Sequence, residues 1–460
     1  MSVESRAARS AAPDADGSIA VALSGGGHRA ALFGLGVLMY LVDAEVNARV
    51  SSVSSVSGGS LTNGYVAQAV DYGSSTPESF RPVAARVSGQ IARGTLWATP
   101  LTWIYVVTLI ALTLAVLVVP WFLPIHVALQ VVVLIVGLLV VAWFAKLRGW
   151  ICARAFARTL LNRDGKPTRL RDVHKEVAHV FCAADLHTGE HVYLSGGFAC
   201  AYRYGVGSAG NVWLHDAVHA SAAYPGGFPA RRLPTAPHEF TGAADENAKR
   251  TSHMVLVDGG VYDNMADEWA LGVRARNERW PDHAAFAEPT ELVVVNASAA
   301  MGWNSLRSLS IPLVGEALTV KRDVDVLYDT TTSTRRRWLV DRFENDIGRM
   351  RGALVHIAQS PLRVPQLIIE SLPPGDERVA RARAVLDALG ASEARWRQVV
   401  ATTRGVKTTL SKLGEEPSAR LVEHGYVLAL ANLHVHLGYP LLEVPAPERF
   451  NALVRGEEAS

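Results

Sequence analysis

The chain has 460 residues, which allows two or three domains at roughly 150 residues per domain. Hydrophobic residues make up 49% of the chain and charged residues only 19%, a balance that excludes disorder over most of its length. The 45 Lys and Arg residues nearly match the 43 Asp and Glu residues, so no basic excess points to a nucleic-acid partner. The three cysteines are too few for a disulfide framework and indicate a reducing compartment or core positions: Cys152, Cys182 and Cys200.

The first predicted elements form two strand–turn–helix units, an arrangement typical of an α/β domain. They follow a small, polar tail that is expected to be disordered and does not resemble a signal peptide. In chain order they are the tail 1–17, a strand at 19–23, a glycine turn and helix to 42, a strand at 50–56, and a serine turn with a helix at 60–70.

A long uncharged segment interrupts this pattern, since residues 94–145 contain no Asp, Glu, Lys or Arg. Within it lie two apolar runs of 19 residues, Leu101–Val119 and Val127–Ala145. As helices rising ~1.5 Å per residue, each is about 28 Å long, close to the ~30 Å hydrocarbon core of a bilayer. Pro120–His126 between them holds two prolines and a tryptophan, which suit a reversal at a membrane interface. We predict a transmembrane helical hairpin, with a core or re-entrant hairpin as the alternative.

Basic residues on the outer flanks orient this hairpin. Arg86 and Arg93 precede it, Lys146, Arg148 and Arg154 follow it, and its loop carries no fixed charge. The positive-inside rule then places both flanks and the attached domain in the cytoplasm. We therefore expect a protein with two helices in the inner membrane or another membrane. The bilayer is then itself a partner, and the oligomeric state stays open.

The α/β pattern resumes after the hairpin, with a further strand at 177–185, another at 291–296, and helical patterns dominating from about residue 301. This organisation predicts five segments. They are the tail 1–17, the first part of the α/β domain 18–98, the hairpin 99–147, the second part of the domain 148–300, and a mainly helical C-terminal region 301–460.

The first motif is the glycine turn Ser24-Gly25-Gly26-Gly27-His28-Arg29-Ala30, at a strand-to-helix junction. Its glycines expose backbone N–H groups and the helix adds the positive end of its dipole, so the turn suits a phosphate or the oxyanion of a tetrahedral intermediate. Gly25-x-Gly27-x-x-Ala30 also fits a dinucleotide fingerprint, but Asp43 and Glu45 fall before the next strand rather than at its end. A nucleotide-binding membrane protein is therefore one alternative. His28 is expected at the surface.

The second motif is Ser55-Val56-Ser57-Gly58-Gly59, after the second strand. A nucleophile elbow needs small residues two positions before and after its serine, and Ser55 and Gly59 satisfy this although glycine is usual at the first. An ordinary Ser/Gly loop is the alternative. We expect this turn to lie beside the glycine turn at one edge of the sheet, with the Gly58 N–H facing the same oxyanion.

The third motif is Leu256-Val257-Asp258-Gly259-Gly260, an apolar strand that ends in an acid. At the carboxyl end of a parallel strand, Asp258 would lie where open α/β sheets bind ligands. A turn aspartate that caps a loop is the alternative.

In this order, GGGxR, SxSGG and DGG resemble motifs of the patatin-like phospholipase and cytosolic phospholipase superfamily, here in a membrane-anchored member of bacterial type. Ala220–Pro229 looks like the family's A-S-x-A-x-P-x-x-F segment, and Asp185–Gly189 resembles another family strand–turn. Ala30 stands where glycine is usual, as in the cytosolic-phospholipase branch. The matches cover roughly residues 18–300 without the hairpin, and imply a three-layer α/β fold with a mainly parallel sheet.

The resemblance implies a Ser–Asp dyad without a histidine, metal or other cofactor. Ser57 would be the nucleophile and Asp258 its base, in acyl transfer to the serine followed by hydrolysis. A carboxylate is a weak base at its ordinary pKa of ~4, so the pKa of Asp258 must be raised or the serine made more acidic. Arg29 would be a structural cation or a substrate-binding cation that faces a phosphate. The oxyanion would be held by the N–H groups of Gly25, Gly26, Gly27 and Gly58.

A serine–histidine–acid triad stays open, with these downstream candidates: His283, His356, His424, His434 and His436. Arg335–Arg337 is expected to be a solvated basic face or to touch anionic headgroups. The sequence predicts a membrane-anchored lipid acyl hydrolase that acts on a phospholipid or lysophospholipid. A catalytically silent lipid-binding or scaffolding protein is the second alternative.

Overall fold

The computed structural model describes residues 17–298, 301, 303, 314–345, 350–390 and 393–457. Within these residues, ten strands form one sheet, in the order β12-β11-β1-β2-β5-β6-β7-β8, and β10 pairs with β5 and β9. The strands from β12 to β5 are parallel and the other pairs antiparallel. The bounds are β1 Ile19–Leu23, β2 Val50–Ser55, β5 Ala178–Asp185, β6 His191–Ser195, β7 Ala199–Ala201, β8 Gly205–Gly207, β9 Arg231–Pro234, β10 His253–Asp258, β11 Glu291–Asn296 and β12 Arg351–His356, with a separate β3–β4 pair at Asn162–Arg163 and Lys166–Pro167.

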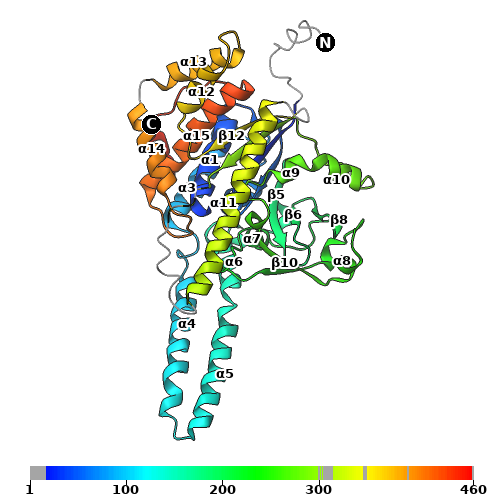
Figure 1. The fold of residues 1–460 in the computed structure, drawn as a ribbon, viewed down its shortest axis with the longest axis vertical. Coiled ribbons are helices and arrows are strands. Elements are labelled where there is room, and N and C mark those ends of the chain that lie inside the picture. Colours follow the sequence, from blue (N-terminus) through cyan, green and yellow to red (C-terminus); the bar gives the residue numbers. More distant parts are fainter. Residues whose placement is uncertain are drawn as a thin grey trace.

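Side chains alternate along the strands and so supply two cores, one on each face of the sheet. In β1, Ile19, Val21 and Leu23 belong to one core, while Ala20 and Ala22 belong to the other. The first core is covered by α1 Gly27–Asp43, α2 Gly58–Ala69, α3 Pro77–Arg93, α7 Leu214–Ser221, α13 Glu377–Leu389, α15 Glu415–Leu437 and α16 Pro447–Arg455. The second is covered by α9 Glu268–Leu271, α10 Val273–Arg279 and α11 Val314–Glu344. This three-layer α/β arrangement confirms the predicted fold class (Figure 1).

The C-terminal region builds part of the same sheet and core. β12 extends the sheet beside β11, and α15 crosses α1 at very short range. A Cβ on Gly36 would lie 2.1 Å from the Val422 carbonyl oxygen, and one on Gly425 would lie 2.1 Å from the Phe33 carbonyl oxygen, so only glycines permit this crossing. The remaining helices of this region are α12 Arg363–Ser371 and α14 Glu393–Gly405.

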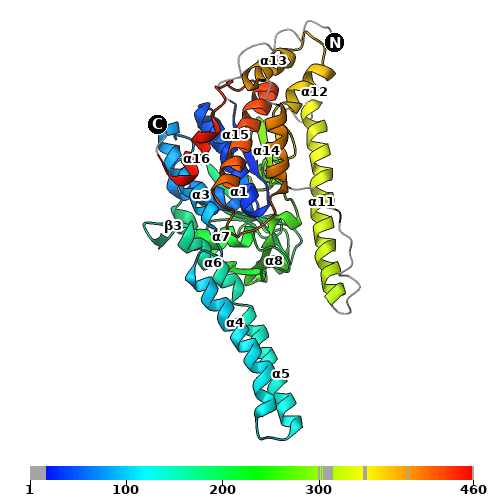
Figure 2. The same cartoon turned by 90° about the vertical axis from the view of Figure 1, so that its left-hand side faces the viewer.

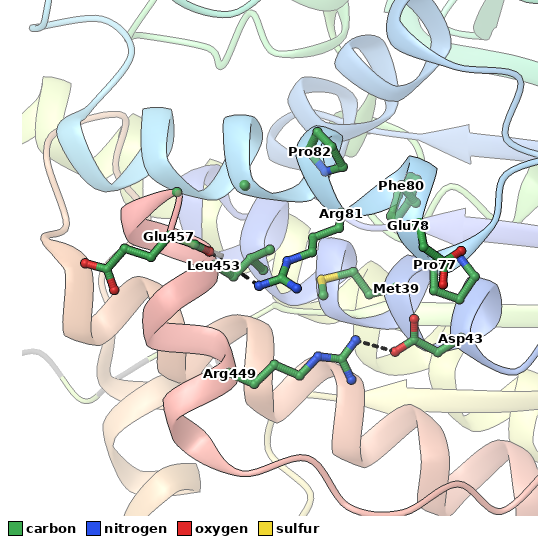
Figure 3. A pocket seen from close by; sticks show the side chains of 12 residues that line it. Met39, Asp43, Pro77, Glu78, Phe80, Arg81, Pro82, Arg449, Leu453 and Glu457 are labelled. Carbon is green, nitrogen blue, oxygen red and sulfur yellow. Dashed lines mark hydrogen bonds and ion pairs between the residues drawn. The ribbon is translucent and has the colours of Figure 1, made fainter. Parts of the chain in front are cut away.

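An ion pair and a hydrogen bond connect α16 and the residues after it to α1 and α3. Figure 3 shows Arg449 of α16 reaching Asp43 at the end of α1, at 2.6 Å. Arg81 of α3 donates to the Glu457 carbonyl oxygen at 3.3 Å. The three helices enclose a side cavity of about 640 Å³ between them.

Arg335 fastens α11 to the body of the domain. Its guanidinium lies 3.4 Å from Asp263 and 2.8 Å from Asp267, two carboxylates that are fully buried. The structure therefore corrects the expectation of a solvated basic face for Arg335 alone, because its side chain is only 23% exposed and its guanidinium pairs with these two acids. Arg336 contacts His356 at 2.8 Å, and Arg337 is exposed.

The predicted hairpin projects from the body as a pair of helices (Figures 1 and 2). It consists of α4 Pro100–Val118, a short turn η4 Val119–Phe122, and α5 Val127–Ala145, in which no residue is buried. In the described part of the chain, the helices at Pro100–Phe122 and Val127–Thr159 are long and apolar enough to cross a membrane. The second includes α6 Arg148–Thr159, which leads back into the domain.

Candidate active site

Ser57 occupies a strained turn between β2 and α2, as a nucleophile elbow requires. Its φ of 50° and ψ of −117° lie outside the regions that non-glycine residues favour. The turn is tightly packed, because a Cβ on Gly59 would lie 2.7 Å from the Leu23 carbonyl oxygen. Ser55 is fully buried. Small residues at both positions are therefore a packing requirement of this turn.

The glycine turn and the serine turn touch each other. A Cβ on Gly58 would lie 2.0 Å from the Gly27 carbonyl oxygen, and one on Gly25 would lie 3.3 Å from the Ser57 Cβ. Gly26 and Gly27 have φ values of 139° and 61°, which glycine adopts without strain. These contacts bring the two turns together at one edge of the sheet.

The free N–H groups of these turns form a set of possible oxyanion donors. Within the described residues, the N–H groups of Gly26, Gly27 and Gly58 donate to no protein acceptor. The Gly25 N–H already donates to the Asn264 carbonyl oxygen at 2.9 Å, which counts against it as an oxyanion donor. Thr409 covers the far side of the turn, since a Cβ on Gly27 would lie 2.6 Å from its carbonyl oxygen. A dinucleotide pyrophosphate would have to displace this cover.

Asp258 reaches Ser57 from the end of β10, and the predicted parallel direction of this strand is wrong. β10 runs antiparallel to β5, not parallel to its neighbours, and Asp258 pairs with Ala183. β2 ends at Ser55, opposite Phe181 of β5. β5 continues past the end of β2, and Asp258 pairs with it two residues further along than Ser55 does. The last residue of β10 therefore lies next to the Ser57 turn.

The Asp258 carboxylate is buried and close to Ser57. Its side chain interacts with that of Ser57, and its Oδ1 accepts a hydrogen bond from the Gly260 N–H at 2.8 Å. Burial raises the pKa of Asp258 to about 7, although both hydrogen bonds oppose this shift. The carboxylate is therefore a far better base than an exposed aspartate.

The segment Ala220–Pro229 accepts hydrogen bonds from the backbones of both Ser57 and Asp258. The Ser221 carbonyl and hydroxyl oxygens accept from the Ser57 N–H at 3.0 and 3.2 Å, and the Ala223 carbonyl oxygen accepts from the Asp258 N–H at 3.1 Å. The Ser221 hydroxyl also lies 2.9 Å from the Ser60 hydroxyl. In the sequence, this segment stands out only by its resemblance to the family. Its run of small residues was the signal that another backbone approaches closely here.

Arg29 points away from bulk solvent and into a set of protein acceptors. Its guanidinium donates to the carbonyl oxygens of Ala297 at 2.8 Å and Val406 at 2.5 Å, and to the Thr408 hydroxyl at 3.2 Å. Burial lowers the pKa of Arg29 to about 10. This geometry favours the structural role over the phosphate-facing one.

His28 is buried, which corrects the expectation of a surface position. Its ring nitrogens lie 2.9 Å from the Ser411 carbonyl oxygen and 2.8 Å from the Thr95 hydroxyl. Burial lowers the pKa of His28 to about 4, so the ring is neutral at physiological pH. His28 and Arg29 together fix the segment 406–411 over the glycine turn.

Ser57 and Asp258 open into a cavity of about 1170 Å³. Its lining also includes Gly25, Gly26, Gly27 and Gly58, and none of its described residues is a histidine. His356 and His424 instead contact the carbonyl oxygens of Asn296 and Gln359, at 3.1 and 3.0 Å. The cavity therefore gives the triad alternative no histidine.

A family model described as patatin-like phospholipase matches residues 21–266, more than half of the chain. Among solved structures, the chain is similar to VipD from Legionella pneumophila, with 12% identity and a TM-score of 0.29 over 97% of this chain and 89% of that one. No curated protein matches the sequence.

Proposed function

Because the chain belongs to the patatin-like phospholipase family, we propose that it is a membrane-anchored phospholipase A or lysophospholipase that works through a Ser57–Asp258 dyad. Family membership supports lipid acyl hydrolysis in general. The observation that carries the specific proposal is the contact between the Ser57 hydroxyl and a buried carboxylate of raised pKa, beside unpaired N–H groups.

The chemistry proceeds in two displacements. Asp258 takes the proton of the Ser57 hydroxyl as its Oγ attacks the ester carbonyl, and the N–H groups of Gly26, Gly27 and Gly58 stabilise the oxyanion. The intermediate collapses to an acyl-serine, and the leaving alkoxide takes the proton from Asp258. Water then attacks the acyl-serine and gives a proton to Asp258, and collapse releases the fatty acid and returns that proton to Ser57.

The position of the hairpin supports a substrate drawn from the bilayer. Leu96 and Trp97 line the cavity and lie just before α4. At the other end of the hairpin, Arg148 donates to the Gly227 carbonyl oxygen at 3.3 Å, beside the cavity-lining Phe228. Both ends of the hairpin thus meet the wall of the cavity, so a lipid of the adjacent leaflet would have a short apolar path to Ser57.

Active-site labelling tests the dyad. We expect a fluorophosphonate probe to label the wild type and a Ser74→Ala control, whose serine is exposed, but not Ser57→Ala. Asp258→Asn should label at least 100-fold more slowly. In mixed liposomes, wild type should release fatty acid and lysophospholipid or glycerophosphodiester, and Ser57→Ala none. No labelling of either protein would favour the silent lipid-binding alternative, and equal labelling of wild type and Ser57→Ala would show that Ser57 is not the reactive serine.

Thiol labelling tests the anchoring and its orientation. The three native cysteines are all buried, so a single engineered cysteine gives a clean signal. We expect a membrane-impermeant maleimide to label Trp121→Cys, in the hairpin loop, from outside the cytoplasmic membrane of intact cells. Ser74→Cys should be labelled only after lysis. Labelling of both variants only after lysis contradicts a spanning hairpin.

A further inference from the structure

The hairpin meets the domain at the segment Ala220–Pro229, which supports both Ser57 and Asp258. The two residues between α5 and α6 keep right-handed helical backbone angles, so α6 directly continues α5 (Figure 1). Arg148 lies at this junction, where its guanidinium donates to the Ala145 carbonyl oxygen of α5 at 3.0 Å. The same guanidinium donates to a carbonyl oxygen of the segment, that of the residue two before Pro229, at 3.3 Å. The end of the hairpin is therefore in direct contact with the segment.

Gly149 brings α6 against the same segment so closely that no side chain fits between them. A Cβ on Gly149 would lie 2.8 Å from the Pro229 Cγ and 3.4 Å from the His219 Cε1. The buried His219 ring lies against the rings of Phe156 in α6 and of Phe228, with centroids 6.5 and 5.9 Å away. α6 thus packs on the segment at both ends, on His219 just before it and on Pro229 at its end.

Backbone hydrogen bonds make the segment compact and connect these contacts to the active site. The N–H groups of both residues before Pro229 donate to the Tyr224 carbonyl oxygen at 3.0 Å. Just before this turn, the carbonyl oxygens of Ser221 and Ala223 accept from the N–H groups of the two dyad residues, at 3.0 and 3.1 Å. The strained backbone of Ser57 persists only while its surroundings hold it. A shift of the segment would therefore change how the nucleophile and the base face each other.

We propose that Gly149 is a positioning residue for the reaction, because it lets α6 pack directly on Pro229 and so fixes the placement of Ser57 relative to Asp258. The hairpin then does more than hold the protein at a membrane, since the helix that leaves it is part of the support of the active site. This inference rests on the proposed function, which assigns the reaction to these two residues.

A methyl group at position 149 tests the proposal in the detergent-solubilised full chain. Carbon atoms in contact are about 3.5–4.0 Å apart, so a methyl 2.8 Å from the Pro229 Cγ overlaps it by about 1 Å. If α6 and the segment share this displacement equally, the dyad shifts by about half an ångström, and a shift of ~1 Å costs about 10²-fold in rate. We expect Gly149→Ala to lower kcat for p-nitrophenyl butyrate about tenfold, with KM within about twofold of wild type. This ester is soluble, so loss of a mere anchor would not slow its hydrolysis.

Matched variants show whether the effect passes through this contact. Gly137→Ala is the control, since its methyl would disturb the hairpin itself, 2.6 Å from Val116, and kcat should stay within about twofold of wild type. In a Pro229→Ala background, adding Gly149→Ala should cost less than about twofold, because the ring that meets the methyl is gone. A wild-type kcat in Gly149→Ala, an equal loss in Gly137→Ala, or no rescue by Pro229→Ala would overturn the proposal.

Arg148→Ala provides a second variant, which adds no bulk and keeps the proposal testable if the methyl at position 149 prevents folding. Loss of its hydrogen bond to the segment should lower kcat about threefold. If Gly149→Ala does not fold, a wild-type kcat in Arg148→Ala would overturn the proposal.

Amide hydrogen exchange separates this inference from the proposed function. Gly149→Ala should speed exchange at the N–H groups of Ser57 and Asp258 several-fold, whereas Gly137→Ala should leave both unchanged. This measurement needs no turnover. A wild type that hydrolyses no ester would refute the proposed function, and the exchange rates would still decide whether α6 supports these two residues. Unchanged exchange at both N–H groups in Gly149→Ala would overturn the inference.

Discussion

Replacing Asp258 by asparagine should abolish activity and at the same time stabilise the protein. The side chain keeps its shape, and its oxygen can still accept from the Gly260 N–H at 2.8 Å. Burial moves the pKa of Asp258 from 3.8 to about 7, which at ~1.4 kcal/mol per pH unit corresponds to about 4 kcal/mol of destabilisation above pH 7. The folded carboxyl holds its proton at pH values where the unfolded one has lost it, so stability falls as the pH rises from about 4 to 7.

Thermal melting of detergent-solubilised wild type and Asp258→Asn across pH 4–8 measures this effect. We expect Asp258→Asn to melt several degrees higher than wild type at pH 8, and the difference to shrink steadily toward pH 4, where the folded carboxyl is neutral and the unfolded one has regained much of its proton. The exposed Asp282→Asn is the control and should show no such trend. A difference that is absent at pH 8, or that grows toward pH 4, would refute the reasoning about the buried base.

Three further outcomes follow from the same contacts. Ester hydrolysis should be half-maximal near pH 7 and fall about tenfold per pH unit below pH 6. A rate that does not change between pH 5 and pH 8 would contradict a base with a pKa of about 7. Gly58→Ala should lower kcat at least 100-fold, because its methyl would lie 2.0 Å from the Gly27 carbonyl oxygen and separate the oxyanion donors; Gly375→Ala, which meets nothing within 4 Å, is the control. Arg335→Gln should destabilise the fold by about 3 kcal/mol in melting experiments, since it leaves the buried Asp263 carboxylate and the adjoining Asp267 without their cation, whereas the exposed Arg337→Gln should not.

The features that the sequence predicted are those encoded within a few neighbouring residues. The hairpin is visible as an uncharged run, and the elbow as small residues around Ser57. The direction of β10 could not be read in this way, because an apolar strand has the same pattern whichever way it runs.

Features that depend on distant partners were missed for the same reason. The burial of His28 rests on Ser411, 383 residues further along the chain. The strand β12 and the residues of α11 that line the cavity lie in a region whose local pattern is mainly helical, and only the assembled fold shows what they contact. Of the candidate site, the sequence predicted the order of the motifs and the two side chains, Ser57 and Asp258, that the fold brings together, while the support from Ser221 and Ala223 required the fold.

The segment over the glycine turn has a consequence for the timing of activity during synthesis. Arg29 binds Val406 and Thr408, which lie 377 and 379 residues later in the chain. At ~5–20 residues per second, a ribosome needs roughly 15–50 s to progress from the end of the hairpin to this segment. The glycine turn therefore gains its cover only after the hairpin has been translated. Under the proposed function, a newly made chain would gain hydrolytic activity only after its hairpin has been synthesised.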